Sequence, residues 1–265
     1  MREEIRSDGI PCTPVLRVVE DVDVVRLTLM HPPLNILTVE GLEELRQALE
    51  LAALRPALKA VVLAAEGRAF SAGLAVEDHL GNRVTRMLDA FHGVFQALWA
   101  LECPTVAAVQ GAALGIGAEL ATFCDIVIAD ESASFGQPEI RAAVFPPIAV
   151  LHYPRRVGPA RALRLLLTGQ VISAAAAERI GLVDRVVPAG TLAEAVDAEV
   201  DRLRSMSAVA LRLTKRAVRE TLGLPFDEGL AVLEDLYRHT VMTTADAEEG
   251  LRAFVEHRKP IWRDR

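Results

Sequence analysis

Short apolar runs, separated by turn-forming residues, alternate with helical patterns along the first half of the chain. Residues 60–65 (AVVLAA) and 105–109 (TVAAV) are almost entirely apolar, and polar or turn-forming residues bound both runs. Runs of this length and composition are typical of strands that are buried on both faces. Residues 21–30 alternate between apolar and polar positions towards their end, which predicts a further strand.

Apolar residues spaced three or four positions apart predict helices between and after these strands. One such pattern follows Thr38, which can cap a helix N-terminus, and stops before Pro56. A longer one covers residues 80–101. Because the order of strand, helix and strand recurs along the chain, the pattern predicts an α/β fold of parallel strands with helices outside.

From Leu192 onward the pattern is helical, with breaks near residues 224 and 243. We therefore expect the chain to have two parts. Residues 1–200 should form the core that carries the functional site, and residues 201–265 should form a C-terminal helical region.

The composition narrows the class of protein. About half of the 265 residues are hydrophobic, and the formal net charge of −7 offers no basic surface to nucleic acid or to an anionic membrane. No apolar run is long enough to span a membrane, and the charged N-terminus MREEIRSDG does not resemble a signal peptide. The cysteines Cys12, Cys103 and Cys124 form neither a metal-binding pattern nor a disulfide framework. We therefore expect a cytoplasmic protein without a metal site.

Residues 105–139 carry the candidate chemistry. The strand is followed by the glycine-rich segment GAALGIG and then by an apolar, helix-favouring run. This order makes backbone N–H groups and the positive end of a helix dipole point at one place. Glu119 lies in the first turn of the predicted helix, and Glu139 follows after a second apolar run. Such an arrangement suits chemistry at a carbonyl group, because the N–H donors can hold its oxygen and the two carboxyl groups can transfer protons.

Spacing alone leaves other interpretations of this stretch open. Small residues before a helix often serve only close packing, and a glutamate in a first helical turn is often a surface charge that matches the helix dipole. A dinucleotide-binding turn is a third possibility, but its spacing requires glycine at position 120, where this chain has Leu120.

The order of residues in this stretch resembles a known family. QGAALGIGAELATFCDIVIAD followed by ASFGQPEI is similar to the signature of the enoyl-CoA hydratase/isomerase family, the crotonase superfamily. The segment AFSAG at residues 69–73 resembles the first oxyanion-hole segment of that family, and residues 165–188 resemble its connection to the C-terminal helices. The resemblance extends from about Val15 to the end of the chain. It implies a crotonase-type spiral of ββα turns with a C-terminal helical region that builds trimers, often paired into hexamers.

The same resemblance implies roles for individual residues. The backbone N–H groups of Leu74 and Ile116 would form an oxyanion hole that holds a thioester oxygen. Glu119 would activate water, and Glu139 would protonate the α-carbon of the substrate.

Further positions are expected to contact the substrate. By resemblance, the carbonyl group of Ala72 meets the adenine of coenzyme A. Gly73 and Gly115 keep the backbone open to close approach, and Pro147 borders the acyl group.

Two segments depart from the pattern of the family. Ala75 and Glu77 stand where relatives often have aspartate and lysine, so the coenzyme A phosphates must be bound elsewhere, for example by Arg68 or Lys259. Pro147 stands where family hydratases have a glycine whose N–H helps to hold the attacking water, and proline has no N–H to donate.

The residues around Pro147 should also change the pocket. The bulky apolar run at residues 148–151 replaces glycines, so we expect an apolar and rigid pocket wall. His152 and Tyr153 could line this altered pocket, although packing is the simpler role for both.

Together these features predict an enoyl-CoA hydratase, which adds water across the α,β double bond of an acyl-CoA thioester, as in fatty acid metabolism. Coenzyme A would be part of the substrate, and no other cofactor, no nucleic acid and no membrane partner is expected. A hydratase for cyclic dienoyl-CoA thioesters, an enoyl-CoA isomerase and a catalytically idle scaffold of the same fold remain alternatives. The presence of both glutamates argues against the isomerase, because relatives that only move a double bond commonly keep just the second.

Overall fold

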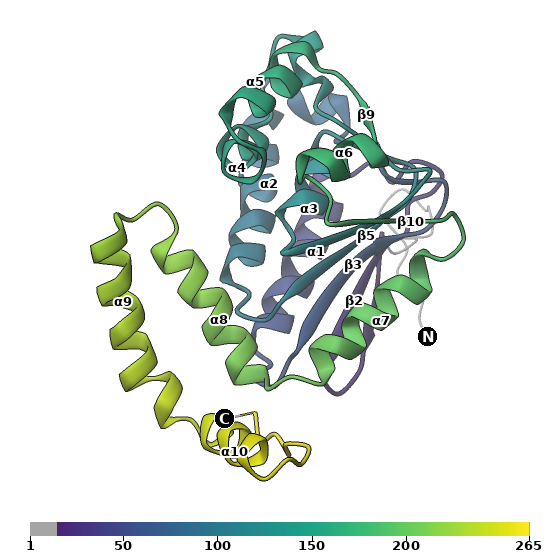
Figure 1. Cartoon of the computed structure of the whole chain (residues 1–265). Helices are drawn as coiled ribbons and strands as arrows, with labels where there is room; N and C mark the ends of the chain where they lie inside the picture. Colours follow the sequence, from purple (N-terminus) through teal and green to yellow (C-terminus); the bar gives the residue numbers. More distant parts are fainter. Residues whose placement is uncertain (1–14, 265) are drawn as a thin grey trace.

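The computed structural model describes residues 15–264, so Cys12 and the charged N-terminal segment lie outside it. The larger of its two sheets contains six strands (Figure 1). Its first two strands are antiparallel, and all other neighbours in it are parallel. In spatial order the strands are β1 (Leu16–Glu20), β2 (Val24–Leu29), β3 (Ala60–Ala65), β5 (Thr105–Val109), β7 (Ile126–Asp130) and β10 (Arg185–Val187).

A smaller sheet contains β4 (Ala69–Ser71), β6 (Ala112–Leu114), β8 (Ser134–Gly136) and β9 (Ile172–Ser173), in this order. The strand pairs β3–β4, β5–β6 and β7–β8 each place their first strand in the large sheet and their second strand in the small one. Helices follow these pairs, so the predicted spiral of ββα turns is confirmed. The residues of β6 lie within the predicted glycine-rich turn, which is therefore shorter than expected.

Helices cover both faces of the large sheet. α1 (Val39–Ala53), α2 (Arg83–Ala100) and α3 (Ile116–Phe123) share one hydrophobic cluster, and α7 (Leu192–Arg204) lies on the opposite face (Figure 1). Thr38 caps α1 as predicted, since its hydroxyl group accepts a hydrogen bond from the Gly41 N–H at 3.3 Å. The remaining core helices are α4 (Pro147–Val157), α5 (Pro159–Thr168) and α6 (Ala174–Ile180), with the short 3-10 helices η1 (Val76–His79) and η2 (Pro138–Ala142).

Side chains of the central strands alternate between the two faces. Val61 and Leu63 of β3 pack with α1 to α3, whereas Val62 packs with Val196 and Val200 of α7. Full burial of a side chain of this size contributes about 1.5–3 kcal/mol. Burial on both faces explains why β3 and β5 are apolar at nearly every position.

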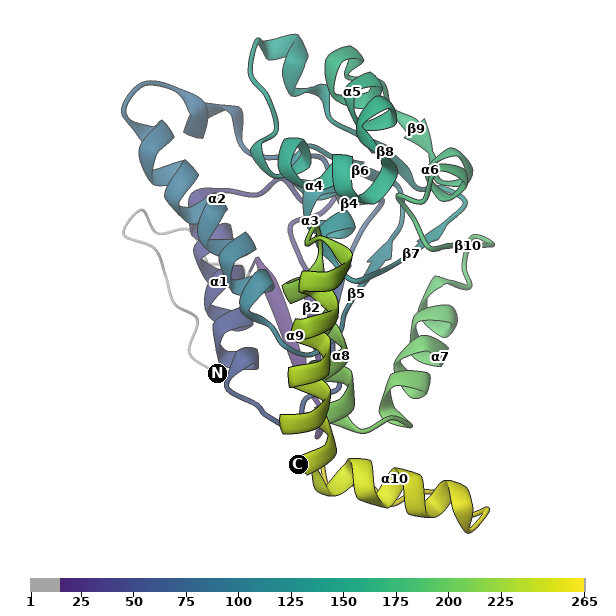
Figure 2. The ribbon, with the colours of Figure 1, turned by 60° about the vertical axis from the view of Figure 1, so that its left-hand side comes forward.

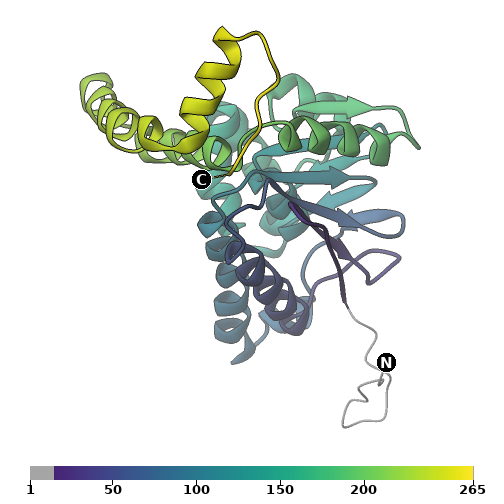
Figure 3. The same cartoon turned by 90° about the horizontal axis from the view of Figure 1, so that it is seen from below.

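The helices after α7 lean away from this core. α8 (Ala208–Thr221) lies beside the ends of α2 and α3, while α9 (Phe226–His239) and α10 (Ala245–Val255) extend beyond it as an arm (Figures 2 and 3). α7 continues through residue 200 to Arg204, and the division of the chain at residue 200 stays a prediction. The arm exposes large apolar side chains, namely Phe226, Leu230, Leu233, Tyr237, Leu251, Phe254 and Val255.

Within residues 15–264, no helix has the length and apolar character needed to cross a membrane. The same residues contain no group of three His, Cys, Asp or Glu side chains arranged to hold a metal ion.

Candidate active site

Three neighbouring strands of the small sheet end at the candidate site. β4 leads to Leu74, β6 leads to Ile116 and Glu119 at the start of α3, and β8 leads to Glu139 in η2. The three strands are parallel, so their carboxyl ends lie at the same edge of the sheet. The fold therefore brings together the four residues to which the sequence assigned oxyanion or proton-transfer roles.

The N–H groups of Leu74 and Ile116 are free to bind an oxygen atom. The Leu37 N–H donates to the Gly73 carbonyl at 3.0 Å, and the Ala75 N–H donates to the Leu37 carbonyl at 2.9 Å. These bonds use the side of the strand that faces Leu37, so the Leu74 N–H points the other way. Ile116 is the first residue of α3, and its N–H has no partner inside the helix. Among the described residues, neither N–H has a hydrogen-bond acceptor.

Gly115 allows the two turns and Glu139 to approach closely. Its φ of 54° lies in the left-handed region, which favours glycine. A Cβ atom at this position would lie 2.4 Å from Oε1 of Glu139 and 3.9 Å from the Cα of Gly73. The Glu139 carboxyl group therefore occupies the space beside the turn that carries the Ile116 N–H, and a larger residue than glycine would displace it.

Glu119 is buried and faces the first turn of α4. Its Oε1 atom accepts a hydrogen bond from the Ala149 N–H at 2.7 Å, and its exposed fraction is 2%. Burial raises the pKa of Glu119 to about 8, the Ala149 N–H acts against this rise, and the charge of Glu139 adds to it. A carboxyl group with such a pKa can take up or release a proton near neutral pH, as general acid–base catalysis requires.

Glu139 is partly buried, and burial raises its pKa above the usual value for a glutamate. Its Oε2 atom is buried and has no hydrogen-bond partner among the described residues. Because two buried carboxyl groups in one site do not ionise together easily, the pair should hold a single proton near neutral pH. Both glutamates therefore have a raised pKa.

Pro147 is the first residue of α4. The sequence suggested that this proline removes an N–H donor from the site, whereas the structure shows that it begins a helix. Proline is favoured at the first position of a helix, where no intrahelical acceptor exists for an N–H. The helix instead presents the Ala149 N–H to Glu119. The expected apolar wall at residues 148–151 is only partly present, because Val150 and Leu151 are 45% and 58% exposed.

The expected contacts with coenzyme A remain predictions. The Ala72 N–H donates to the Leu34 carbonyl at 2.8 Å, while no described residue donates to the Ala72 carbonyl, so that oxygen is free to accept a hydrogen bond. The side chains of Arg68 and Lys259, the two candidates for phosphate binding, are exposed, as phosphate-binding groups at the mouth of a site would have to be.

Gln137 is a residue of this region that the sequence patterns did not single out. It lies between β8 and η2, and its exposed fraction is 1%. Its Nε2 atom donates to the Tyr153 hydroxyl at 2.9 Å, so Tyr153 is a buried partner of Gln137. The only signal in the sequence was a polar residue directly after a buried strand and two positions before Glu139.

The comparison with known families agrees with this geometry. A family described as "Enoyl-CoA hydratase/isomerase" matches residues 20–265, which is nearly the whole chain. The chain belongs to the enoyl-CoA hydratase/isomerase family. The predicted resemblance is thereby confirmed.

Individual members of the enoyl-CoA hydratase/isomerase family match this chain over most of its length. A probable enoyl-CoA hydratase of Mycobacterium tuberculosis is 38% identical over 240 residues, which cover 88% of this chain and 92% of the relative. A cyclohexa-1,5-dienecarbonyl-CoA hydratase of Thauera aromatica is 38% identical over 245 residues, which cover 92% and 95%. The crystal structure of an enoyl-CoA hydratase from Bacillus anthracis has a TM-score of 0.89 at 31% identity, covering 95% of this chain and all of that one. The predicted fold, including its C-terminal helices, is therefore confirmed.

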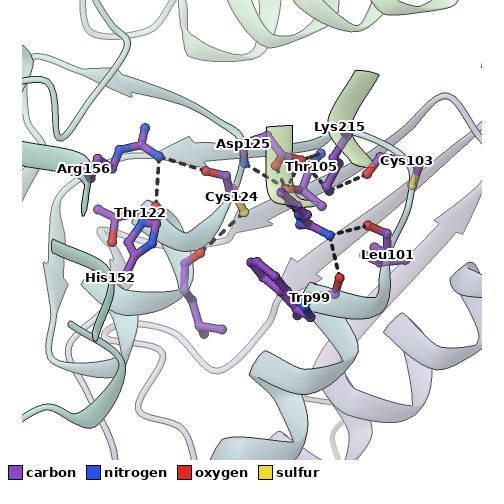
Figure 4. A network of polar contacts seen from close by, with 12 residues as sticks. Trp99, Leu101, Cys103, Thr105, Thr122, Cys124, Asp125, His152, Arg156 and Lys215 are labelled. Carbon is purple, nitrogen blue, oxygen red and sulfur yellow. Dashed lines mark hydrogen bonds and ion pairs between the residues drawn. The ribbon is translucent and has the colours of Figure 1, made fainter. Parts of the chain in front are cut away.

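In this family member, basic side chains surround the other end of α3 (Figure 4). His152 and Arg156 of α4 contact the Thr122 carbonyl at 2.7 and 3.0 Å, and Arg156 also donates to the Cys124 carbonyl at 3.1 Å. They satisfy carbonyl groups that a helix C-terminus leaves unpaired. Burial lowers the pKa of His152, so the imidazole is neutral near pH 7 and its Nε2–H donates to the carbonyl. The packing role that we expected for His152 is thus the one found.

α8 is fixed to the same region. Lys215 donates to the Cys103 carbonyl at 2.7 Å and pairs with Asp125 at 2.6 Å (Figure 4). Asp125 also accepts hydrogen bonds from the N–H and the hydroxyl group of Thr105, both at 2.8 Å. One turn further along α8, Arg219 donates to carbonyl groups at the end of α2. These contacts attach the C-terminal helices to the spiral core.

A groove of about 640 Å³ lies between α8 and the ends of α2, α3 and α4. Trp99 and Phe123 line it together with apolar side chains of α8, and Arg155 adds a positive charge. None of the residues with expected chemical roles lines this groove. It lies at the C-terminal end of α3, whereas the glutamates lie at the N-terminal end, so we do not assign the reaction to it.

Proposed function

We propose that this chain is an enoyl-CoA hydratase that uses Glu119 and Glu139 to add water across the α,β double bond of an acyl-CoA thioester. The observation that carries the proposal is the placement of two free backbone N–H groups beside two carboxyl groups with raised pKa values. The family and the names of its relatives make the chain an enzyme of the hydro-lyase type.

The thioester oxygen would accept hydrogen bonds from the N–H groups of Leu74 and Ile116. Both donors are fixed by the backbone before the substrate arrives, so they need no reorganisation as negative charge develops on the oxygen. The Ile116 N–H is also at the positive end of the α3 dipole, which further stabilises an enolate-like state.

The positions of the two glutamates support different roles. Glu139 lies against Gly115, beside the Ile116 N–H, and therefore close to the carbon atom next to the thioester carbonyl. Glu119 lies one helical turn further away, where the β-carbon would be. The reacting state is the one in which the single proton of the pair lies on Glu139 and Glu119 is ionised. In the forward reaction from this state, water gives one proton to Glu119 and its oxygen bonds to the β-carbon, while Glu139 gives its proton to the α-carbon. Transfer of the proton from Glu119 back to Glu139 restores the starting state.

The acyl group could be a straight-chain or a cyclic one. Two observations favour a cyclic dienoyl thioester as a second candidate. By the resemblance to the family, Pro147 stands where straight-chain hydratases have a glycine, and the relative named for a cyclic dienoyl substrate is as similar to this chain as a general hydratase is. A ring fixes the reacting carbons and so loses little conformational entropy on binding.

The exposed apolar side chains of α9 and α10 support assembly into a trimer or a hexamer. The measurement is the mass from sedimentation at micromolar concentration, for which we expect three or six times 28.7 kDa. A mass of one chain would contradict the proposal. The cytoplasmic location stays a prediction.

The test of the reaction uses a panel of straight-chain and cyclic enoyl-CoA thioesters. Loss of the absorbance of the conjugated thioester, together with a mass increase of one water, is the expected result. A shift of the double bond without a change in mass would instead identify an isomerase. No change with any thioester would favour a scaffold that does not catalyse a reaction.

A further inference from the structure

The buried amide group of Gln137 has one satisfied end and one free end. Its Nε2 atom donates to the Tyr153 hydroxyl at 2.9 Å. Its Oε1 atom is buried and has no hydrogen-bond donor among the described residues. An unpaired buried acceptor destabilises the protein, so a group that supplies a donor is expected to bind there during function.

Tyr153 fixes this amide relative to the two glutamates. Its side chain is buried, and the charges of Glu119 and Glu139 both raise the pKa of its hydroxyl group, after the larger effect of burial. Tyr153 and Ala149 are four residues apart on α4 and therefore lie on the same face of the helix. The same helix therefore contacts both residues: the Ala149 N–H donates to Glu119, and the Tyr153 hydroxyl accepts a hydrogen bond from Gln137.

The other unpaired buried oxygen has a separate explanation. Oε2 of Glu139 also lacks a partner within residues 15–264. A carboxyl O–H that transfers its proton to a carbon atom should not be held by another hydrogen bond, because that bond would have to break first. The free acceptor of Gln137 has no such explanation, since an amide does not transfer protons at neutral pH.

We propose that Oε1 of Gln137 accepts a hydrogen bond from the attacking water, and from the β-hydroxyl group of the product, in an orientation fixed by Tyr153. This inference rests on the proposed hydratase function. The water would have two acceptors, Glu119 for the proton that it loses and Gln137 for the proton that it keeps. With both protons directed in this way, a lone pair of the water oxygen faces the β-carbon. The bonds that form are C–O at the β-carbon, C–H at the α-carbon and O–H on Glu119. The bonds that break are the C=C π bond, one O–H of water and the O–H of Glu139, so no oxidant or reductant is needed.

The first test is Gln137→Met, which keeps the size of the side chain and removes the acceptor. We expect hydration to slow by about tenfold or more, because the nucleophile is less well oriented. Exchange of the α-protons of butyryl-CoA in D₂O, followed by NMR, should stay near the parent rate. That reaction uses the oxyanion hole and Glu139 but no attacking water.

Binding gives a second readout that does not depend on turnover. The affinity of Gln137→Met for 3-hydroxybutyryl-CoA should fall about fivefold relative to its affinity for butyryl-CoA, because only the former has the hydroxyl group. Tyr153→Phe should reproduce both effects more weakly, since it frees the amide without removing it.

The control is Ser207→Ala, which removes another buried hydroxyl group, one that donates to Asp246 far from the glutamates. It should lower the stability and leave both rates unchanged. If Gln137→Met hydrates at the parent rate, or loses hydration and α-proton exchange in equal proportion, the role of Gln137 is wrong. If the parent protein exchanges α-protons but hydrates no thioester, the proposed function itself fails and this inference fails with it.

Discussion

The two ends of α3 are built in opposite ways. At its C-terminal end, carbonyl groups receive hydrogen bonds from His152 and Arg156, and the neighbouring Asp125 pairs with Lys215. At its N-terminal end, the Ile116 N–H has no acceptor among the described residues, and the carboxyl group of Glu119 is buried with a raised pKa.

This difference shows which end of α3 has polar groups that can bind a substrate. Satisfied polar groups stabilise the fold, whereas unsatisfied ones cost free energy that a bound substrate can recover. The C-terminal end of α3 therefore serves mainly to hold the helix in place, while the N-terminal end presents groups to a ligand. Substitutions at the two ends should separate stability from activity.

The largest effect should follow loss of either carboxyl group at the N-terminal end. We expect Glu119→Gln and Glu139→Gln each to reduce hydration on the order of 10²–10⁴-fold, because each removes a positioned acid or base. The measurement is kcat/KM on the best thioester of the panel. Circular dichroism and the sedimentation mass should match the parent protein. A variant that retains nearly the parent rate would show that its glutamate has a different role.

A second effect concerns stability and its dependence on pH. The pKa of Glu119 is about 8 in the folded protein and near 4.5 in an ordinary glutamate, so the folded state binds more protons between these values. Its stability should therefore fall as the pH rises from about 5 to 8. Glu119→Gln carries no charge at position 119, so this loss of stability does not occur in it. It should be more stable than the parent by about 5 kcal/mol at pH 9 and by much less at pH 5.

Urea unfolding at several pH values measures this difference. The control is Glu131→Gln, which changes an exposed glutamate and should leave the pH dependence as it is. A constant difference between Glu119→Gln and the parent from pH 5 to 9 would contradict the raised pKa.

At the C-terminal end, Lys215→Met should lower the free energy of unfolding by about 2 kcal/mol, since it removes a mostly buried ammonium group that pairs with Asp125 and leaves the Cys103 carbonyl without its donor. The rate per folded molecule should not change. Arg216→Met is the matched control on the same helix, because Arg216 pairs with Glu220 at the surface. We expect it to cost at most about 0.5 kcal/mol. If folded Lys215→Met loses turnover, the C-terminal end of α3 also affects activity, and the proposed division of stability and activity between the two ends is wrong.

The smallest effect should come from Pro147→Gly. It restores an N–H at the start of α4, close to Glu119, where the family resemblance implies that water is held. We expect kcat/KM for crotonyl-CoA to rise about threefold relative to that for a cyclic dienoyl-CoA thioester. An unchanged ratio would mean that the proline does not affect the choice of substrate.

Local patterns in the sequence were sufficient for much of the fold. Burial on both faces makes β3 and β5 continuous apolar runs, and the cap at Thr38 marks the start of α1. The family signature, which is a run of residue types, also indicated Glu119 and Glu139 before any contact was known. Short elements without a pattern were missed: β6 has only three residues inside a glycine-rich segment, and α4 begins at a proline pair that looks like a break.

Tertiary structure alone decided how these residues act. The Ala149 N–H reaches Glu119 from 30 positions away, and Tyr153 reaches Gln137 across 16. No local pattern encodes such contacts, because a backbone N–H is the same in every residue type except proline and its partner depends on which helix end packs beside it. Gly117 shows the same limit, since a Cβ there would lie 2.3 Å from the Ser71 carbonyl of β4. The sequence by itself determined which residue types are available to the site, and the packing of α3 against β4 and α4 decided which of their polar groups are satisfied and which remain free to bind.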